Sequence, residues 1–523
     1  MPISSTQQKQ ELFRAIWATA DDLRNSVDGW DFKAYILGTL FYRFISENLS
    51  GYVNRMQREA GDPDFDYATL PDAEAEAARK TLVAEKGFFI LPSQLFENVR
   101  RRAASDPDLN LTLENAFGAI EASAVGTPSE DALRGLFADF DVNSIKLGNT
   151  VELRNERLTT ILNRIGSIDL GVGGDYGQHQ IDVFGDAYEF LMTMYAGNAG
   201  KSGGEFFTPQ EVSELLARIV SHGRTAVGKV YDPACGSGSL LLKFAKVLGP
   251  EGVQRGFYGQ EINVTTYNLC RINMFLHDVN FSRFHIRCGD TLLQPQHWDD
   301  EPFDAIVSNP PYSRPWVGSD DPLLINDQRF APAGVLAPKG KSDLAFTMHM
   351  LHWLSTDGTA AIVEFPGVLY RGGAEKKIRS YLVENNYVDT VIQLPPNLFF
   401  GVSIATCIIV LRKSKREAST LFVDASQCFV HEGNKNKLSP ADIETILSAY
   451  ASRAETPHFS ALVDNRRIAQ NDYNLSVSSY VEAEDTRPVI DIHELNQRID
   501  RIVEHEAQLR AEINEIIREL ETA

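Results

Sequence analysis

Tyr231-Asp232-Pro233-Ala234-Cys235-Gly236-Ser237-Gly238-Ser239 is the stretch of sequence that decides the fold. It follows Lys229-Val230 and precedes an apolar stretch with helical spacing, so we expect it to be the turn between a strand and a helix. Gly236 and Gly238 allow a ligand to approach the backbone, and the start of the next helix favours a negative group such as a carboxylate. The pattern lacks the Gly-Lys-Ser/Thr ending of a nucleoside-triphosphate loop, and Leu241 replaces the last glycine of a dinucleotide-binding loop. It predicts an α/β fold with a ligand at this turn.

Further polar residues stand where predicted strands end. Glu261 ends the strand predicted at 256–260, a position from which a carboxylate can accept hydrogen bonds from both ribose hydroxyls of a nucleoside. Asp290 ends the next strand and can accept a hydrogen bond from an adenine amino group. Either carboxylate alone could equally be one that begins a helix. Because Asp232, Glu261, Asp290 and Asn309 all follow strands, we interpret them as one ligand site.

Asn309-Pro310-Pro311-Tyr312 follows the apolar strand predicted at 303–307. The Asn309 side-chain oxygen and the Pro310 carbonyl can both accept hydrogen bonds from one exocyclic amino group, while the prolines fix the backbone. Tyr312 offers a ring on which a flat base can stack. An amino group held in this way keeps its lone pair free to attack an electrophile, which suits methyl transfer to an NH2 nitrogen. An isolated match could also be only a proline-rich turn.

The segment 203–211, Gly-Gly-Glu-Phe-Phe-Thr-Pro-Gln-Glu, predicts the start of another helix. Thr208 would be the N-cap, Pro209 the first helical residue, and Glu211 the partner that closes a Thr-x-x-Glu capping box. Phe206 and Phe207 could be core residues, the commoner place for aromatic rings. Their position just before a helix start that favours anions makes a cofactor wall the preferred interpretation.

Taken in this order, these segments resemble the S-adenosylmethionine-dependent amino-methyltransferases of the gamma arrangement. Outside them, 28–38 and 370–375 are similar to the methyltransferase (modification, M) subunit of type I restriction-modification systems, and 4–8 and 41–48 are similar to its IC branch. The resemblance implies a Rossmann-like domain, S-adenosyl-L-methionine as cofactor, and double-stranded DNA with a flipped adenine as substrate. It also implies a separate specificity (S) subunit that reads the DNA sequence, a restriction (R) subunit in the full complex, and two copies of this chain per complex.

The motifs and the resemblance together give three sets of candidate residues. Cys235 is placed in the cofactor loop and not as a nucleophile, because amino methylation needs no covalent intermediate. The family counterpart of 395–401 lies at the target-base pocket, so one of two phenylalanines would face Tyr312, although core packing is nearly as probable for either ring. No metal is implied. The sets are catalytic Asn309, Pro310, Pro311 and Tyr312; cofactor-binding Glu205, Phe206, Phe207, Thr208, Pro209, Gln210, Asp232, Cys235, Gly236, Ser237, Gly238, Ser239, Glu261 and Asp290; and target-base pocket Tyr312, Phe399 and Phe400.

The net charge of the 523-residue chain bears on how it meets DNA. Fifty basic residues against 71 acidic ones give a formal net charge of −21. A protein that grips duplex DNA alone usually shows a basic surface, so we expect most phosphate contacts to come from another subunit. No apolar run is long enough to span a membrane and no signal pattern begins the chain, so a soluble cytoplasmic protein is expected. The five cysteines form no C-x-x-C pair, which favours reduced thiols.

The sequence predicts three parts. Residues 1–165 have helical periodicity and predict an all-helical N-terminal domain. Residues 166–480 begin with a glycine-rich linker and then alternate strands with helices, which predicts the methyltransferase domain. The family resemblance implies that 388–394 and 405–411 form an antiparallel end of its sheet. Residues 481–523 predict a helical tail whose apolar seam from Ile492 to Leu520 would dock on a partner subunit, with packing on the same chain as the alternative.

The loop 313–342, rich in proline and glycine, is predicted to close on the extruded base, with a mobile insertion as the alternative. The sequence as a whole predicts a DNA N6-adenine methyltransferase subunit. Three alternatives stay open: an N4-cytosine DNA methyltransferase, a protein glutamine methyltransferase, and a catalytically silent assembly subunit. The DNA recognition sequence is not predicted.

Overall fold

The computed structural model of the protein divides into two units by its contacts, Met1–Val481 and Glu482–Ala523. The residues that the structure describes are 10, 13, 14, 16, 31–168, 185, 187–191, 208–249, 251–399, 401–433, 435–484 and 491–522. Within these ranges, no helix is both long enough and apolar enough to cross a membrane.

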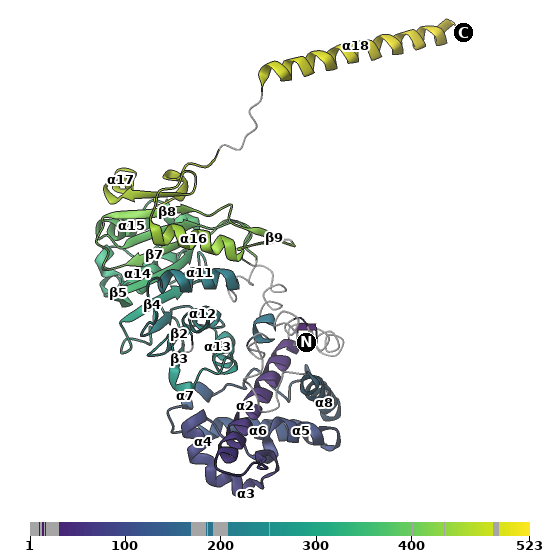
Figure 1. Cartoon of the computed structure of the whole chain (residues 1–523), viewed down its shortest axis with the longest axis vertical. Coiled ribbons are helices and arrows are strands. Elements are labelled where there is room, and N and C mark those ends of the chain that lie inside the picture. The colour runs from purple at the N-terminus through teal and green to yellow at the C-terminus, as the bar shows by residue number, and fades with distance from the viewer. Residues whose placement is uncertain are drawn as a thin grey trace. The chain divides into compact units, whose positions relative to one another are not determined.

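The described residues from 31 to 168, in the N-terminal part of the first unit, form helices and no strand, as predicted. Its longest helix, α2 (Asp31–Glu59), buries Leu37, Leu40, Phe41 and Phe44, whose spacing puts them on one face of the helix. The other helices of this part are α3 (Asp72–Ala75), α4 (Arg79–Lys86), α5 (Phe96–Arg102), α6 (Leu109–Ser123), α7 (Glu130–Leu133) and α8 (Val151–Ser167) (Figure 1). Of the predicted linker 166–177, only the first residues lie in the described ranges, at the end of α8.

Helix α13 (Val264–Leu276) joins this helical part to the sheet. The buried Arg271 guanidinium donates hydrogen bonds to the carbonyl oxygens of Asp131 and Arg134, at 3.0 and 2.9 Å. The rings of Phe41 and Phe275 have centroids 6.0 Å apart. These contacts explain why the helical part and the sheet belong to one compact unit.

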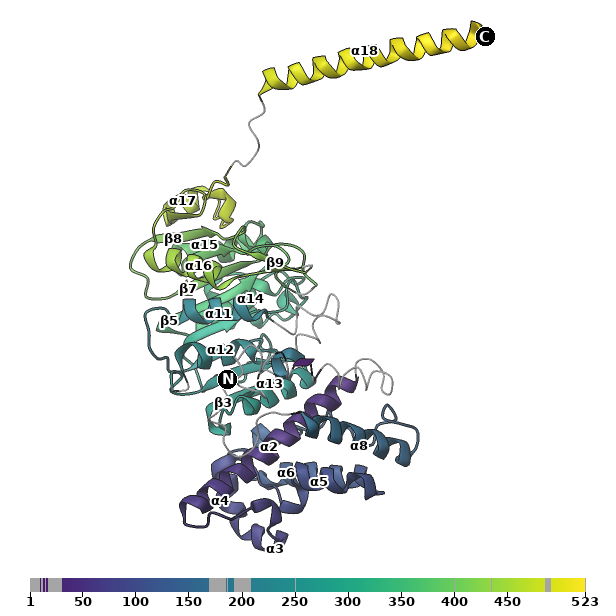
Figure 2. The ribbon, with the colours of Figure 1, turned by 45° about the vertical axis from the view of Figure 1, so that its right-hand side comes forward.

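A nine-stranded sheet forms the centre of the rest of this unit, in the order β11-β8-β6-β7-β5-β4-β1-β2-β3. Figure 2 shows β8, β7, β5 and β3 following one another in this order. The five strands from β5 to β3 in this order are mutually parallel. The strands are β1 (Val230–Asp232), β2 (Phe257–Glu261), β3 (Phe284–Cys288), β4 (Phe303–Ser308), β5 (Leu354–Glu364), β6 (Val388–Gln393), β7 (Cys407–Arg412), β8 (Ser419–Asp424) and β11 (Ser460–Asp464). A separate hairpin pairs β9 (Val430–Glu432) with β10 (Lys435–Lys437).

The predicted antiparallel end of the sheet is correct in its pairing and wrong in its place. β6 and β7 are antiparallel, and β7 is also antiparallel to β5. The pair does not end the sheet, however, because β8 adds parallel to β6 and β11 adds antiparallel to β8. The sequence that follows β7 therefore extends the same sheet.

Helices cover both faces of the sheet, as in a doubly wound α/β fold. In β5, Ala361 and Val363 belong to one apolar core, whereas Ala360 and Ile362 belong to the other, because successive side chains of a strand point to opposite faces. The first core includes residues of α11 (Gln210–Val220), α12 (Ser239–Leu248), α13 and α16 (Pro440–Ser452), and the second includes residues of α14 (Asp343–Trp353), α15 (Ala374–Glu384) and α17 (Asn465–Gln470). The predicted α/β fold class is confirmed.

The parallel strands bring the predicted ligand residues to one edge of the sheet. β4, β1, β2 and β3 are neighbours, and their carboxyl ends lie at the same edge. Asp232 and Glu261 are the last residues of β1 and β2, and Asn309 and Asp290 follow β4 and β3 within two residues. Ligands of open α/β sheets bind at this edge.

The second unit contains α18 (Ile492–Thr522), a helix of 31 residues. Its apolar residues are exposed within this unit: Leu495 by 44%, Ile502 by 65% and Ile513 by 56%. Such a helix gains little stability from its own apolar face, because burial of that face against other elements supplies most helical stability in proteins.

Candidate active site

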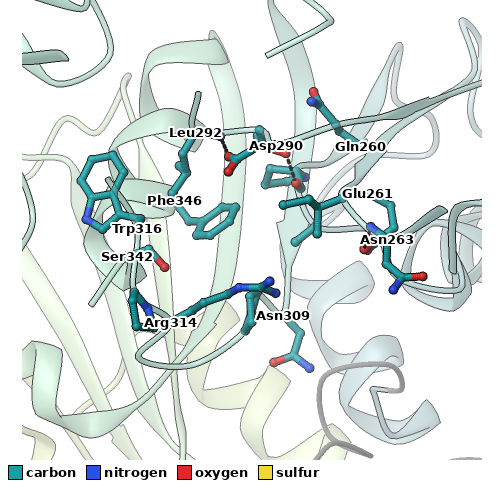
Figure 3. A pocket seen from close by; sticks show the side chains of 16 residues that line it. Gln260, Glu261, Asn263, Asp290, Leu292, Asn309, Arg314, Trp316, Ser342 and Phe346 are labelled. Atoms are coloured by element: carbon teal, nitrogen blue, oxygen red, sulfur yellow. Dashed lines mark hydrogen bonds between the residues drawn. The ribbon is translucent and has the colours of Figure 1, made fainter. Parts of the chain in front are cut away.

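A cavity of about 370 Å³ lies at the carboxyl edge of the sheet, where the loops after β1, β2, β3 and β4 meet (Figure 3). It brings together four of the predicted residues, Glu261, Asp290, Asn309 and Pro311. The complete lining consists of Pro233, Ala234, Gln260, Glu261, Ile262, Asn263, Asp290, Thr291, Leu292, Asn309, Pro311, Arg314, Pro315, Trp316, Ser342 and Phe346.

The Asn309 side-chain amide is held at both ends. Its Nδ2 donates a hydrogen bond to Thr208 Oγ1 at 3.1 Å, and its Oδ1 accepts one from the Tyr312 hydroxyl at 2.5 Å. Burial raises the pKa of Tyr312 well above its ordinary value, so the hydroxyl stays protonated and can donate. An amide oxygen has two lone pairs, so Oδ1 can accept a second hydrogen bond from a ligand. The two partners thus fix the direction in which that free lone pair points.

The predicted helix start at Thr208 is wrong. Helix α11 begins at Gln210, its N-cap is Pro209, and no side chain caps it. The predicted capping box between Thr208 and Glu211 is therefore absent. The Thr208 hydroxyl is instead the partner of Asn309, which lies far away in the sequence.

Tyr312 stands among aromatic rings. Its ring centroid lies 6.3 Å from that of Phe399 at an interplanar angle of 86°, and 5.9 Å from that of Phe365 at 44°. Phe399 is 2% exposed. The edge-to-face contact leaves no room for a base between Tyr312 and Phe399, so a stacked base would require these rings to separate. Phe365 was not predicted from the sequence, and Phe400 lies outside the described residues.

The glycine loop and Glu261 are tied together. Glu261 Oε2 accepts a hydrogen bond from the Gly236 backbone N–H at 3.1 Å, and Oε1 accepts one from the Asn263 N–H at 2.9 Å. Burial raises the pKa of Glu261, and these N–H groups oppose that rise. Gly236 and Gly238 have φ of 53° and 78°, the left-handed region that favours glycine. At Gly238 an added Cβ would also lie 2.7 Å from Cys270 Sγ.

Asp232 lies behind the cavity and does not line it. Its side chain is 1% exposed, and Oδ1 accepts hydrogen bonds from Ser308 Oγ at 2.9 Å and from the Ala234 N–H at 3.0 Å. Burial raises the pKa of this carboxyl to about 7. Asp232 therefore joins the loop after β1 to the end of β4, just before Asn309.

Three other predicted side chains of the glycine loop face the protein interior. Cys235 is 5% exposed, and its Sγ lies 3.9 Å from Cys270 Sγ. Ser237 and Ser239 are buried, and their hydroxyls are 3.1 Å apart. The neighbouring Cys270 thiol and burial raise the pKa of the Cys235 thiol, which opposes a role as a nucleophile.

Asp290 lines the cavity at the turn after β3. Its Oδ1 accepts a hydrogen bond from the Leu292 backbone N–H at 2.9 Å (Figure 3). It accepts another from the Leu293 backbone N–H at 3.2 Å. These bonds hold the turn that forms one wall of the cavity.

Gln210, in the first turn of α11, has a buried side-chain amide with no hydrogen-bond partner in the described part of the chain. Such an amide is costly to bury unless a ligand or another group pairs with it. The predicted cofactor residues Glu205, Phe206 and Phe207 lie outside the described residues.

The loop 313–342 supplies cavity residues that were not predicted: Arg314, Pro315 and Trp316. The sequence held a signal for them, because they closely follow Tyr312. In Figure 3 the Arg314 side chain extends toward Asn309. The loop is packed in the structure: Trp316 meets Phe330 edge to face, with centroids 5.6 Å apart, and both rings are buried.

Arg329 anchors the same loop to the cavity wall. Its guanidinium is 1% exposed and donates hydrogen bonds to the carbonyl oxygens of Thr291 and Leu292, at 2.9 and 2.7 Å. It also pairs with the Asp327 carboxylate at 2.8 Å. The loop is thereby fixed to the turn after β3.

Comparison with known proteins gives matches over most of the chain. The N-6 DNA Methylase family matches residues 179–488, and the HsdM N-terminal domain matches residues 12–165. The type I restriction enzyme MpnII methylase subunit of Mycoplasma pneumoniae is 47% identical over 532 residues, covering 98% of this chain and 97% of that protein. The MjaVIII methylase subunit of Methanocaldococcus jannaschii is 31% identical, covering 72% of this chain and 68% of that one.

A solved structure agrees with these matches. The type I restriction-modification methyltransferase subunit of Streptococcus thermophilus superposes with a TM-score of 0.81 at 34% identity, covering 91% of this chain and all of that one. These matches do not distinguish the IC branch, which stays a prediction. The predicted ligand residues lie around one cavity at the carboxyl edge of the sheet, and the matches cover nearly the full length of the chain. This chain therefore belongs to the methylase-subunit family of type I restriction enzymes.

Proposed function

We propose that the protein transfers a methyl group from S-adenosylmethionine to the N6 amino group of a flipped adenine in double-stranded DNA. The observation that carries this proposal is the Asn309 amide, oriented by Thr208 and Tyr312 at the wall of the cavity. The family match supports DNA methylation, and we add the proposal that the target is the N6 amino group of adenine.

Asn309 would act on the amino group of the base. Its free Oδ1 lone pair and the Pro310 carbonyl can each accept one amino hydrogen, which directs the nitrogen lone pair toward the cavity. Both oxygens would stabilise the positive charge that grows on the nitrogen as it is methylated. Because the groups are held in place beforehand, positioning supplies most of the rate enhancement, and no strong base is required.

The cavity suits the proposed cofactor. Bound S-adenosylmethionine would supply the electrophilic methyl group. Glu261 could accept hydrogen bonds from ribose hydroxyls, and Asp290 could accept one from an adenine amino group. The α12 start at the glycine loop could favour the carboxylate of the amino-acid end.

The target base would enter beside Tyr312. Flipping costs a few kcal/mol, which stacking and hydrogen bonds can offset. Phe365 and Phe399 already surround the Tyr312 ring, so the pocket for the base would form when these rings move apart.

The DNA sequence would be read by a separate specificity subunit, with a restriction subunit in the full complex and two copies of this chain. The net charge of −21 supports a partner that supplies phosphate contacts. The apolar residues that α18 leaves exposed within its own unit support this helix as a docking element.

Replacing Asn309 by alanine tests the proposal. In the assembled complex, N309A should lower kcat for DNA methylation by more than tenfold while S-adenosylmethionine affinity changes only a few fold, because the lost oxygen acts mainly in the transition state. Asn163, an exposed asparagine of α8 that does not line the cavity, provides the matched control N163A. Retention of more than a tenth of the activity by N309A would refute the assigned role.

A further inference from the structure

The residue that follows the catalytic tetrapeptide has an unusual backbone conformation. Ser313 has φ of 49°, in the left-handed region that residues with a Cβ rarely adopt. Such conformations persist only where the surrounding structure holds them, and they cluster at functional sites. Ser313 is adjacent to Tyr312, whose hydroxyl must reach Asn309 Oδ1.

Asp343 holds this turn. Its Oδ1 accepts a hydrogen bond from the Ser313 backbone N–H at 2.9 Å, across the whole length of the loop. Beside it, the Ser342 N–H donates to the Arg314 carbonyl oxygen at 3.0 Å. Asp343 lies in the first turn of α14, where a carboxylate is favoured, and α14 packs against β5. A rigid element is therefore tied directly to the end of the catalytic motif.

The Asp343 carboxylate is more buried than an N-terminal helix residue usually is. It is 1% exposed, and its second oxygen, Oδ2, is buried with no hydrogen-bond partner among the described residues. Glu364, at the end of β5, is also fully buried; Oε1 accepts from Thr347 Oγ1 at 3.0 Å and Oε2 has no partner in the described ranges. Burial raises the pKa of Glu364 well above its ordinary value, and the Asp343 carboxylate raises it further.

A fold would not keep two orphaned carboxylate oxygens in its interior for stability alone, because each is costly to bury. Leucine would fill much of the same space without a buried polar group, but it would leave the Ser313 N–H without this acceptor. The hydrogen bond to the Ser313 N–H joins Asp343 directly to the residue that follows the catalytic motif.

We infer that Asp343 is a positioning residue for methyl transfer: it holds Ser313 in the left-handed conformation that aims the Tyr312 hydroxyl at Asn309. The inference rests on the proposed function of Asn309 and adds to it a residue that does not touch substrate. Removing the acceptor would let residue 313 relax, displace Tyr312, and leave the Asn309 amide fixed only by Thr208.

Four variants of the full-length chain, assayed in the assembled complex, test the inference. D343A should lower kcat by about 10- to 100-fold, the scale of a displacement of about 1 Å at a catalytic group, with S-adenosylmethionine affinity within about threefold of wild type. D343N keeps an acceptor of the same shape and should retain kcat within about threefold. The double variant D343A/S313G should have a much higher kcat than D343A, because glycine adopts the left-handed conformation without being held. S313G alone is the reference that shows what the glycine does when Asp343 is present.

Recovery of kcat in D343A/S313G distinguishes a loss of positioning from a general loss of structure, because glycine at 313 would not restore a destabilised helix α14. The inference is overturned if D343A keeps more than half of kcat, if D343N is as impaired as D343A, or if S313G gives no recovery. N309A, measured alongside, separates the two ideas: an active N309A refutes the proposed function itself, whereas an inactive N309A with an active D343A refutes only the role of Asp343.

Discussion

At the scale of single residues, the buried Asp232 carboxylate makes stability depend on pH. Its pKa is raised by burial to about 7, whereas an aspartate in an unfolded chain titrates near pH 3.9. The folded protein therefore binds this proton more tightly than the unfolded chain. The stabilising contribution of the protonated form is complete below about pH 4 and is lost as the pH rises to about 7, a change on the order of 4 kcal/mol.

We predict that D232N removes this dependence. An asparagine Oδ1 can still accept from Ser308 and the Ala234 N–H, so the contacts at the end of β4 are kept. The melting temperature of D232N relative to wild type should rise steadily between pH 4 and pH 8. A difference that stays constant over this range would show that Asp232 does not titrate with a raised pKa.

Glu261 links the glycine loop to the cavity, and its removal should weaken cofactor binding. We expect E261A to lower S-adenosylmethionine affinity by roughly 10- to 100-fold, the scale of one or two hydrogen bonds to a charged group. E261Q, which keeps the shape and one acceptor, should lose less. Calorimetry on the isolated full-length chain measures both, and unchanged affinity in E261A would mean that Glu261 serves only the turn between β2 and α13.

At the scale of elements, the loop 313–342 depends on one buried cation. Arg329 bonds to Asp327 and to two carbonyl oxygens of the cavity wall, so R329M would remove the donor of both carbonyl oxygens and the cation beside Asp327, which keeps only the hydrogen bond from the backbone N–H of residue 329. We predict a loss of about 3–5 kcal/mol in the free energy of unfolding, as for other broken buried ion pairs. R329K keeps the charge but cannot reproduce the planar hydrogen-bonding geometry of the guanidinium, so its free energy of unfolding should lie between those of wild type and R329M.

Denaturant unfolding followed by circular dichroism measures this effect. A loss below 1 kcal/mol in R329M would show that the loop is held mainly by Trp316 and Phe330. Whether the loop also closes on an extruded base stays a prediction.

The strand ends could be predicted from the sequence because short local patterns determine them. An apolar strand, a glycine loop and a helix start occupy consecutive residues, and the parallel pairing of such units puts Glu261, Asp290 and Asn309 around one cavity. The capping box failed for the opposite reason. The Thr208 hydroxyl has a partner at residue 309, and no local pattern shows that contact.

The end of the sheet was missed for a related reason. The sequence pattern of β6 and β7 indicates strands. The addition of β8 and β11 beyond β6 depends on which edge of the sheet is still unpaired once the other strands have paired, and the sequence pattern does not show this. The left-handed backbone conformation of Ser313 could not be predicted from the sequence either, because the residue that holds it, Asp343, lies at the far end of the loop.

At the scale of the whole molecule, several basic residues hold the fold and so contribute less to a DNA-binding surface. Arg379 is 2% exposed and donates to the carbonyl oxygens of Val368 and Tyr473. Lys413 donates to the carbonyl oxygens of His352 and Leu354. Their engagement with backbone carbonyls strengthens the expectation that a partner supplies most phosphate contacts.

We predict that deleting residues 489–523 leaves a folded protein that binds S-adenosylmethionine, since every residue of the cavity lies before α18. The truncated chain should fail to assemble with the specificity subunit and should therefore not methylate DNA. As a matched pair in the full chain, I513K places a charge on the apolar seam and should impair assembly, whereas R510A should not. Size-exclusion chromatography with the partner measures assembly, and normal assembly of the truncated chain would refute docking through the tail.

The most direct test of the central claim is the identity of the methylated nucleoside. Complexes of the wild-type chain or N309A with the specificity subunit are incubated with labelled S-adenosylmethionine and duplex DNA, and the digested nucleosides are separated and weighed by mass spectrometry. The account predicts label in N6-methyladenine with the wild-type complex and almost none with N309A. Label in N4-methylcytosine, label in protein, or no transfer by the assembled wild-type complex would contradict it.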